Sequence, residues 1–201
     1  MSRIWSWVTR SRWGRAGGVI ALAAGGATLG LDTSHGAVST TDYQAIVQLV
    51  HDSQLAEQTA CLPAGLNPQA SVITVASAAT IATVQARIAS TEQNYYTGAY
   101  ETGLTGLLQR NCRAALTGGQ SMDLAGGVGP ISCSDVSVTG TTAHATCQLQ
   151  EWLRGLVDYG NGGVRTVQPS GPTIVNDDFV QTPSGWRISS EERGPVPGTG
   201  P

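Results

Sequence analysis

The chain has 201 residues, which is enough for one domain with a substantial core, and its 40% hydrophobic content is that of a globular protein. Charged residues make up only 12%, and every basic residue is an arginine. Residues 37–201 hold seven arginines against thirteen acidic residues, a net charge of −6. This balance leaves no broad basic surface and argues against binding to nucleic acid or to anionic lipid headgroups.

The first 36 residues have the organisation of an export segment. Residues 1–15 contain four arginines and three tryptophans, residues 16–31 carry no charge, and residues 32–37 form a short polar stretch. A basic, then apolar, then polar order is typical of a secretory signal, and the small residues Ser34 and Gly36 favour cleavage after Gly36. The sequence therefore predicts that the rest of the chain lies outside the cytoplasm.

Two alternatives to a cleaved signal stay open for residues 16–31. The tryptophans and the positive flank are also typical of an uncleaved membrane anchor. A spanning helix needs about 20 apolar residues, however, and this stretch is shorter and contains five glycines. Those glycines also disfavour a buried core helix. We expect a protein that is either secreted or anchored to the cell membrane, with a single domain over residues 37–193.

Helical patterns occupy the first half of this domain. Thr41 and Gln44 form a candidate capping box, and apolar residues then recur on one face, so we expect a helix over residues 42–58. Residues 78–116 show the same spacing, but three glycines interrupt it. The sequence predicts two helical segments there, or one kinked helix, with the junction near residues 96–98.

Strand patterns follow. A hairpin is expected over residues 131–152 with Gly140 at its turn, then a short strand over 164–167. A second hairpin is expected over 173–192, turning at Pro183–Ser184, with Phe179 opposite Ile188 and Trp186 on the same face. The glycines of residues 126–129 are interpreted as a loop, and residues 194–201 as a disordered Pro/Gly tail. Helices followed by antiparallel strands define the α+β class.

Four cysteines lie beyond the apolar stretch, at Cys61, Cys112, Cys133 and Cys147. An even number in an exported domain predicts two disulfides, with three alternative pairings. A hairpin centred on Gly140 places Cys133 opposite Cys147, which favours that bridge and leaves Cys61 to pair with Cys112. The wide spacing of the cysteines does not match a metal site, and no metal or cofactor is expected.

Two segments resemble a known family. Residues 179–192 (FVQTPSGWRISSEE) look like the closing hairpin of NTF2-like, or cystatin-like, domains, and residues 136–145 (VSVTGTTAHA) resemble the hairpin before it. The resemblance implies helices packed on the concave face of a curved antiparallel sheet, a cone-shaped α+β fold. One departure is that no early strand pair is found between the helices. Exported or membrane-anchored bacterial proteins of this architecture, of actinobacterial type, include accessory subunits of transport or conjugation machinery.

The same resemblance supplies cavity candidates, because some members of the superfamily combine a cavity carboxylate with tyrosine hydrogen-bond donors. On the helices these are Tyr95, Tyr96 and Tyr100. On the strands, Asp177 faces inward by parity but near the start of its strand, where solvent is close, whereas Asp178 faces outward. His144 is a further candidate, placed opposite Val136 by the hairpin register.

No catalytic motif accompanies these residues, and no catalytic residue is assigned. The principal hypothesis is a non-enzymatic extracytoplasmic binding or assembly domain, in the finer form an accessory subunit of a cell-envelope transport or conjugation system. The alternative is a small cavity enzyme of isomerase or hydratase type that uses an aspartate with a helix tyrosine. The expected partners are a protein or a small apolar ligand, with a homodimer through the sheet as a further option.

Overall fold

The computed structural model describes residues 38–196; the predicted export segment, residues 1–36, lies outside the described residues, as do residues 197–201 of the predicted tail. Three helices are followed by five strands. They are α2 (Thr40–Thr59), α3 (Ala78–Glu92), α4 (Gly98–Thr117), β1 (Ser121–Thr139), β2 (Thr142–Asp158), β3 (Val164–Val167), β4 (Ser170–Thr182) and β5 (Gly185–Pro195), with a 3-10 turn at Gly160–Gly162. None of the helices in residues 38–196 is both long enough and apolar enough to cross a membrane.

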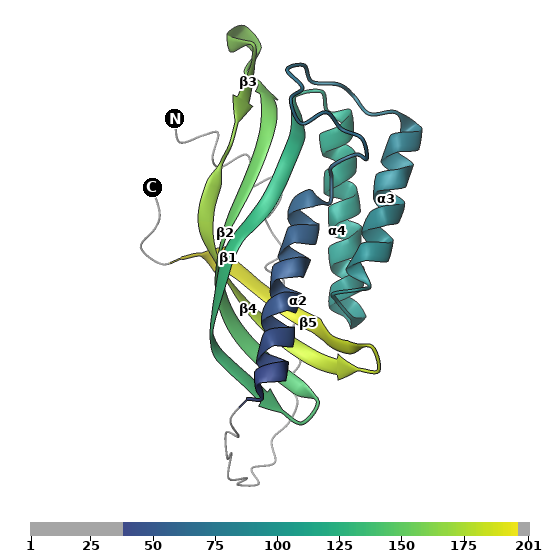
Figure 1. Cartoon of the computed structure of the whole chain (residues 1–201). Helices are drawn as coiled ribbons and strands as arrows, with labels where there is room; N and C mark the ends of the chain where they lie inside the picture. Colours follow the sequence, from purple (N-terminus) through teal and green to yellow (C-terminus); the bar gives the residue numbers. More distant parts are fainter. Residues whose placement is uncertain (1–37, 197–201) are drawn as a thin grey trace, which may run out of the picture. The chain divides into compact units, whose positions relative to one another are not determined.

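The five strands form one antiparallel sheet in the order β1-β2-β4-β5, and β3 pairs with the far end of β2. The strands bend strongly, and all three helices lie on one face of the sheet (Figure 1). This is the predicted α+β class, with helices packed on a curved antiparallel sheet. The predicted order of elements is confirmed, because local hydrophobic periodicity and turn residues specify both halves of the chain.

Local signals explain where the helices begin and end. Helix α2 is capped by Ser39, whose Oγ accepts from the Asp42 amide at 3.0 Å, so the predicted capping box at Thr41 is wrong by two residues. Ser77 caps α3 in the same way. The junction expected near residues 96–98 is present, because α3 ends at Glu92 and α4 begins at Gly98, whose φ of +69° suits glycine.

The β1–β2 hairpin differs from its predicted register at the tip. Its turn is Gly140–Thr141, with Thr139 opposite Thr142, and a bulge between Ser134 and Ser137 then restores the register that places Cys133 opposite Cys147. As a result Ser137, and not Val136, lies opposite His144. The predicted pairing of His144 with Val136 is wrong, since a bulge inserts residues that a regular hairpin does not contain.

Strands β1 and β4 begin earlier than the sequence indicates. The glycines interpreted as a loop at residues 126–129 lie inside β1, where they allow close approach of neighbouring groups. A Cβ on Gly127 would lie 2.5 Å from the ring of Trp152 on β2, and one on Gly126 would lie 2.5 Å from the carbonyl oxygen of Gln58. Strand β4 begins at Ser170 and not at residue 173. The glycines and Pro172, which favour loops in a sequence, here lie in an edge strand, β1, and near the start of β4.

The final hairpin follows its prediction. Thr182 pairs with Gly185 and Phe179 with Ile188, and Trp186 is buried on the same side. Strand β5 continues to Pro195, which lies opposite Thr173, so the first two residues of the predicted tail are paired in the sheet.

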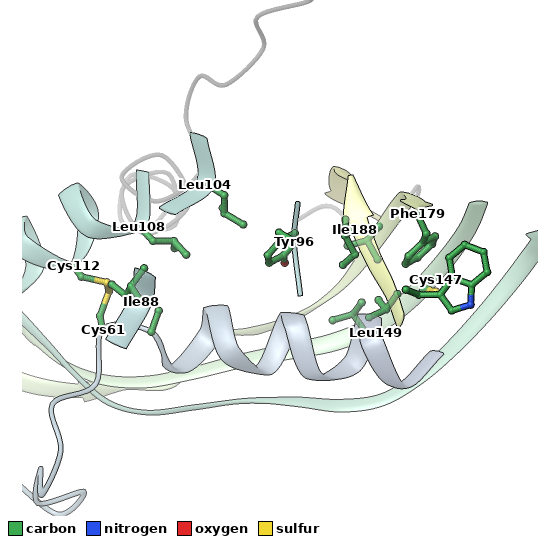
Figure 2. Packing of buried hydrophobic residues seen from close by; sticks show 14 of the residues in the cluster. Cys61, Ile88, Tyr96, Leu104, Leu108, Cys112, Cys147, Leu149, Phe179 and Ile188 are labelled. Carbon is green, nitrogen blue, oxygen red and sulfur yellow. A yellow bond between two sulfur atoms is a disulfide. The ribbon is translucent and has the colours of Figure 1, made fainter. Parts of the chain in front are cut away.

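The core lies between the helices and the sheet, and both favoured disulfides are present. Cys61 is bonded to Cys112 and Cys133 to Cys147. The first bridge joins the end of α2 to α4, and the second joins β1 to β2. Figure 2 shows Tyr96 between the apolar side chains of the helices and those of the sheet. Tyr96 is 1% exposed, and its segment pairs with Ile188 on β5.

Candidate functional site

The concave side of the sheet carries a group of buried charges beside its apolar residues. We call five carboxyl groups the interior acidic cluster; Arg193 on β5 is the arginine that contacts three of them. The members of the cluster are Glu57 on α2, Glu92 at the end of α3, Glu151 on β2, Asp177 on β4 and Glu191 on β5. The cluster therefore has five acids and one guanidinium, which contacts three of them, in an interior where charges are costly unless they are paired.

Arg193 connects three of these acids. Its Nη2 lies 3.0 Å from Oε1 of Glu191 and 3.4 Å from Oε2 of Glu57, and its Nη1 lies 3.4 Å from Oε1 of Glu151. Gln54 of α2 completes the arrangement, because it accepts from Arg193 and donates to Oε2 of Glu191 at 2.8 Å. The neighbouring carboxylates raise the pKa of Arg193 against the effect of its burial, so the guanidinium stays charged.

Two tyrosines border the same cluster. Tyr96 donates its hydroxyl hydrogen to Oε1 of Glu57, and its ring lies 5.5 Å from that of Tyr100. Burial, followed by the nearby Glu57 and Glu191 carboxylates, raises the pKa of both phenols. Both tyrosines are therefore neutral hydrogen-bond donors at ordinary pH.

Asp177 has a different environment from the one expected. It is fully buried in the middle of β4, opposite Ala145 and Glu191, because the strand begins three residues earlier than predicted. The expectation of nearby solvent is wrong. Neither carboxyl oxygen has a hydrogen-bond partner among residues 38–196. Burial, followed by the charge of Glu191, raises the pKa of Asp177 well above its usual value, although Arg193 opposes this.

Two acids on the helices, Glu57 and Glu92, also have raised pKa values. Burial raises the pKa of Glu57 to about 8, against the opposing effect of Arg193. Burial, with the charges of Glu191 and Glu101, raises the pKa of Glu92 to about 7, and Oε2 of Glu92 has no hydrogen-bond partner in the described part of the chain. A buried carboxyl without a partner is cheapest when it is protonated.

His144 and Asp178 lie on the opposite, outer face of the sheet. His144 Nδ1 is 2.9 Å from Oδ1 of Asp178, and Ser190 donates to the other oxygen of Asp178 at 2.8 Å. The hydrogen bond from His144 lowers the pKa of Asp178, and that from Ser190 adds to it. These residues border a shallow hollow of about 310 Å³ to which Ser137 and Ser189 also contribute.

Of the six candidates from the sequence, Tyr95 is partly buried in the connection between α3 and α4, and the other five form two groups. Tyr96, Tyr100 and Asp177 belong to the interior, whereas Asp178 and His144 face the other side of the sheet and cannot act with the helix tyrosines. Within residues 38–196 no set of three or more histidine, cysteine, aspartate or glutamate side chains is arranged to hold a metal ion.

Sequence reasoning missed most of the interior acidic cluster. Glu57 and Glu92 sit on helices whose apolar spacing was read without them. Glu191 and Arg193 have the parity of outward residues if β5 is regular, since Trp186 and Ile188 point inward. A register shift between Asp178 and Phe179 reverses that parity. The consecutive charged residues Glu191, Glu192 and Arg193, directly beyond the apolar part of the hairpin, are the one available signal.

Comparisons with known proteins concern the fold. No family model matches the chain, and no curated protein is similar to it. Solved structures that it resembles include a periplasmic fragment of TraM, with 12% identity, a TM-score of 0.44 and coverage of 79% of this chain and 98% of that one. An NTF2-like superfamily protein from Salmonella enterica serovar Typhimurium has 12% identity, a TM-score of 0.42 and coverage of 80% and 95%. CagV, a VirB8 homolog from Helicobacter pylori, has 8% identity, a TM-score of 0.41 and coverage of 74% and 98%.

The described residues form an α+β domain with three helices on a curved, open antiparallel sheet. NTF2-like and cystatin-like structures are among those that it resembles. At these identities the likeness concerns the arrangement of helices and strands alone.

Proposed function

We propose that the chain is an extracytoplasmic binding or assembly domain. The observation that supports this most directly is the pair of disulfides, Cys61–Cys112 and Cys133–Cys147, which together use all four cysteines. Disulfides form and persist in oxidising compartments and are rare in the cytosol. The basic and apolar N-terminal segment agrees with this compartment.

The arrangement of the interior favours binding over catalysis. Arg193 contacts three carboxyl groups and Tyr96 donates to Glu57, so the polar groups of the interior are already partners of one another. The surface, by contrast, offers hollows. Besides the one beside His144, a hollow of about 290 Å³ lies at the Cys61–Cys112 end, and Val75, which lines it, is 61% exposed.

The finer form of the proposal is an accessory subunit of a cell-envelope transport or conjugation system. It derives from the resemblance of the two hairpins to exported NTF2-like domains. Its partner is a protein or a small apolar ligand. A homodimer through the outer sheet face has less support, because that face of β2 and β4 carries polar residues. They include Thr142, His144, Thr146, Gln148, Asn176 and Asp178.

Cell fractionation with N-terminal sequencing tests the compartment. A chain that begins near Ala37 in the medium indicates a released domain, and an intact Met1 in the membrane fraction indicates an anchored one. Thiols must be alkylated before lysis, so that oxidation during extraction is excluded. Peptide mapping without reduction should then show both disulfides. Recovery of four alkylated cysteines from the cytosolic fraction contradicts the proposal.

A second candidate function, a small cavity enzyme or ligand-binding domain, is favoured by Asp177. Its buried and unpartnered carboxyl lies on the same side of the sheet as Tyr96 and Tyr100. With a raised pKa, Asp177 would donate a proton to a ligand oxygen and would not act as a base. Thermal-shift measurements with small ketones and phenols test this. Stabilisation that disappears in Asp177→Asn but persists in Asp178→Asn supports it, whereas no shift with any of them counts against it.

A further inference from the structure

The interior acidic cluster contains more acid than its surroundings can neutralise. Arg193 contacts Glu57, Glu151 and Glu191, so one positive charge faces three carboxyls at 3.4 Å or less. Glu151 has further donors in Gln58 and Thr173, at 2.9 and 2.8 Å. Glu191 has Gln54 as well as the guanidinium. Glu151 and Glu191 therefore have both the guanidinium and neutral side-chain donors as partners.

The other three acids have fewer hydrogen-bond donors around their carboxyl groups. Asp177 is completely buried with no hydrogen-bond partner in residues 38–196 for either oxygen, and Glu92 is 1% exposed with one oxygen unpartnered. Glu57 is 4% exposed and accepts from Tyr96, but it shares the single guanidinium of Arg193 with Glu151 and Glu191. Ionisation of all three would place several uncompensated charges in the interior, which proteins avoid by keeping such groups neutral.

The three helices, the α3–α4 connection and strands β2, β4 and β5 all contribute charged or titratable groups to the cluster. The charged or titratable groups that face it are Glu57 on α2, Glu92 on α3, Tyr95 and Tyr96 in the α3–α4 connection, Tyr100 and Glu101 on α4, Glu151 on β2, Asp177 on β4, and Glu191 and Arg193 on β5. Among these described groups Arg193 is the only base. Asp178, on the outer face, adds one more negative charge near Asp177.

We propose that the interior acidic cluster is a proton-binding site, in which Glu57, Glu92 and Asp177 hold protons that the unfolded chain releases at the same pH. The ligand is the hydrogen ion itself, bound at three carboxyl groups contributed by both layers of the fold. No covalent chemistry is involved. When the chain folds, these three carboxyl groups take up protons. When they lose the protons at higher pH, the folded state is destabilised.

The direction of the pKa shifts agrees with this geometry. Burial raises the pKa of Glu57 to about 8 and that of Glu92 to about 7, from 4.5 in both cases. Groups with a raised pKa in the folded state contribute their full stability below the unfolded value and lose it as the pH rises through the folded value. The domain should therefore be most stable in mildly acidic solution and weaken between about pH 5 and pH 8, a range fixed by these two shifts.

The cluster lies beside the hydrogen bonds that join the α3–α4 connection to β5; we call this contact the seam. Ile188 donates to the Tyr95 carbonyl at 2.8 Å and accepts from the Thr97 amide at 3.0 Å, directly beside Glu92 and Tyr96. Repulsion between newly ionised Glu57, Glu92 and Asp177 would act on this seam first. An exported domain meets external pH without cytoplasmic buffering, so the site couples external pH to the docking of α3 and α4 on β5.

Urea unfolding of the oxidised protein, as isolated from cells, tests the proposal over pH 5 to 9. Each proton bound more tightly in the folded state raises the unfolding equilibrium constant about tenfold per pH unit between the two pKa values. We expect a rise of at least about tenfold per unit between pH 5.5 and 7. A constant that is flat or falls over this range overturns the proposal.

Amide variants supply the second arm. Asp177→Asn and Glu92→Gln mimic the protonated groups, so each should fold as well as the parent at pH 8 and reduce the slope by up to one proton. Asp178→Asn, one residue away on the outer face, should leave the slope unchanged. If the first two variants keep the full slope, the protons are bound elsewhere and the proposal fails.

Two further measurements cover the remaining outcomes. Infrared spectra at pH 7 should contain a band from protonated carboxyl groups; because this is read on the parent protein, it stands even if a variant does not fold. Absence of that band contradicts the proposal. Methylammonium, sodium or calcium ions added at pH 9 should not restore stability. Recovery with any of them would show that a bound cation, and not the proton, neutralises the cluster.

Discussion

Arg193 on the last strand lies 3.4 Å from Glu57 on the first helix, and so links the two ends of the described chain through the interior. Replacing Arg193 by methionine keeps much of its volume but leaves Glu191, Glu57 and Glu151 without their shared cation. Breaking a buried ion pair from one side costs about 3–5 kcal/mol. Arg193→Met should therefore lower the free energy of unfolding at pH 8 by about that amount, and by less at pH 5, where the acids can protonate.

The matched control for this prediction is Arg187→Met on the same strand. Arg187 donates only to the backbone carbonyls of Ser184 and Trp186 in its own hairpin. Its loss should cost less than about 1 kcal/mol, as surface substitutions usually do. Equal effects of the two substitutions in urea unfolding at pH 8 would contradict the role given to Arg193.

The sequence predicts this fold better than it predicts the interior acidic cluster, and the reason lies in the strand register. Helix boundaries and the hairpin at Pro183–Ser184 depend on neighbouring residues, which a single sequence contains. The inward positions of Glu191 and Arg193 depend on a register shift between Asp178 and Phe179, which reverses the alternation. Because both residues are charged, alternation alone places them in solvent.

For Asp177 the sequence predicts the face of the sheet correctly but not the burial. Its inward parity could be read from Phe179, but its burial depends on the length of β4 beyond Pro172 and on the helices that cover it. Prolines near strand ends signal loops more often than pairing, so the sequence predicts a start at residue 173, three residues later than the observed start at Ser170. Parity is a local property, whereas depth in the interior is set by contacts distant in sequence.

The two disulfides should differ in how much they stabilise the domain. They close segments of 51 residues for Cys61–Cys112 and 14 residues for Cys133–Cys147. Chain-entropy arguments assign them about 4 and about 3 kcal/mol respectively. The double variants Cys61→Ala/Cys112→Ala and Cys133→Ala/Cys147→Ala should therefore lose stability in that order. Urea unfolding under oxidising conditions measures both, and the reverse order would show that the β1–β2 bridge has a role beyond restricting the unfolded chain.

The bulge in β1 predicts opposite effects for two substitutions at one position. Asp135 has a φ of +53°, a left-handed conformation that costs most L-residues about 1–2 kcal/mol and costs glycine nothing. Asp135→Gly should therefore unfold at the same urea concentration as the parent or a higher one. Asp135→Val should lose about 1–2 kcal/mol, because a β-branched side chain tolerates this conformation poorly. Equal stability of the two variants would mean that the bulge relaxes in solution, and with it the placement of Ser137 opposite His144.

Three glycines give a sharper test of the packing, since the same change to alanine should stabilise the domain at one of them and destabilise it at the other two, for two different reasons. Gly103, inside α4, has open space around a Cβ, so Gly103→Ala should add about 0.5–1 kcal/mol through helix propensity. Gly98 begins the same helix with a φ of +69°, so Gly98→Ala should destabilise despite equally open space. At Gly127 the backbone is not left-handed, but a Cβ would lie 2.5 Å from the Trp152 ring. Overpacking against that ring should cost about 1–3 kcal/mol and shift tryptophan fluorescence, which separates a displaced ring from a strained backbone.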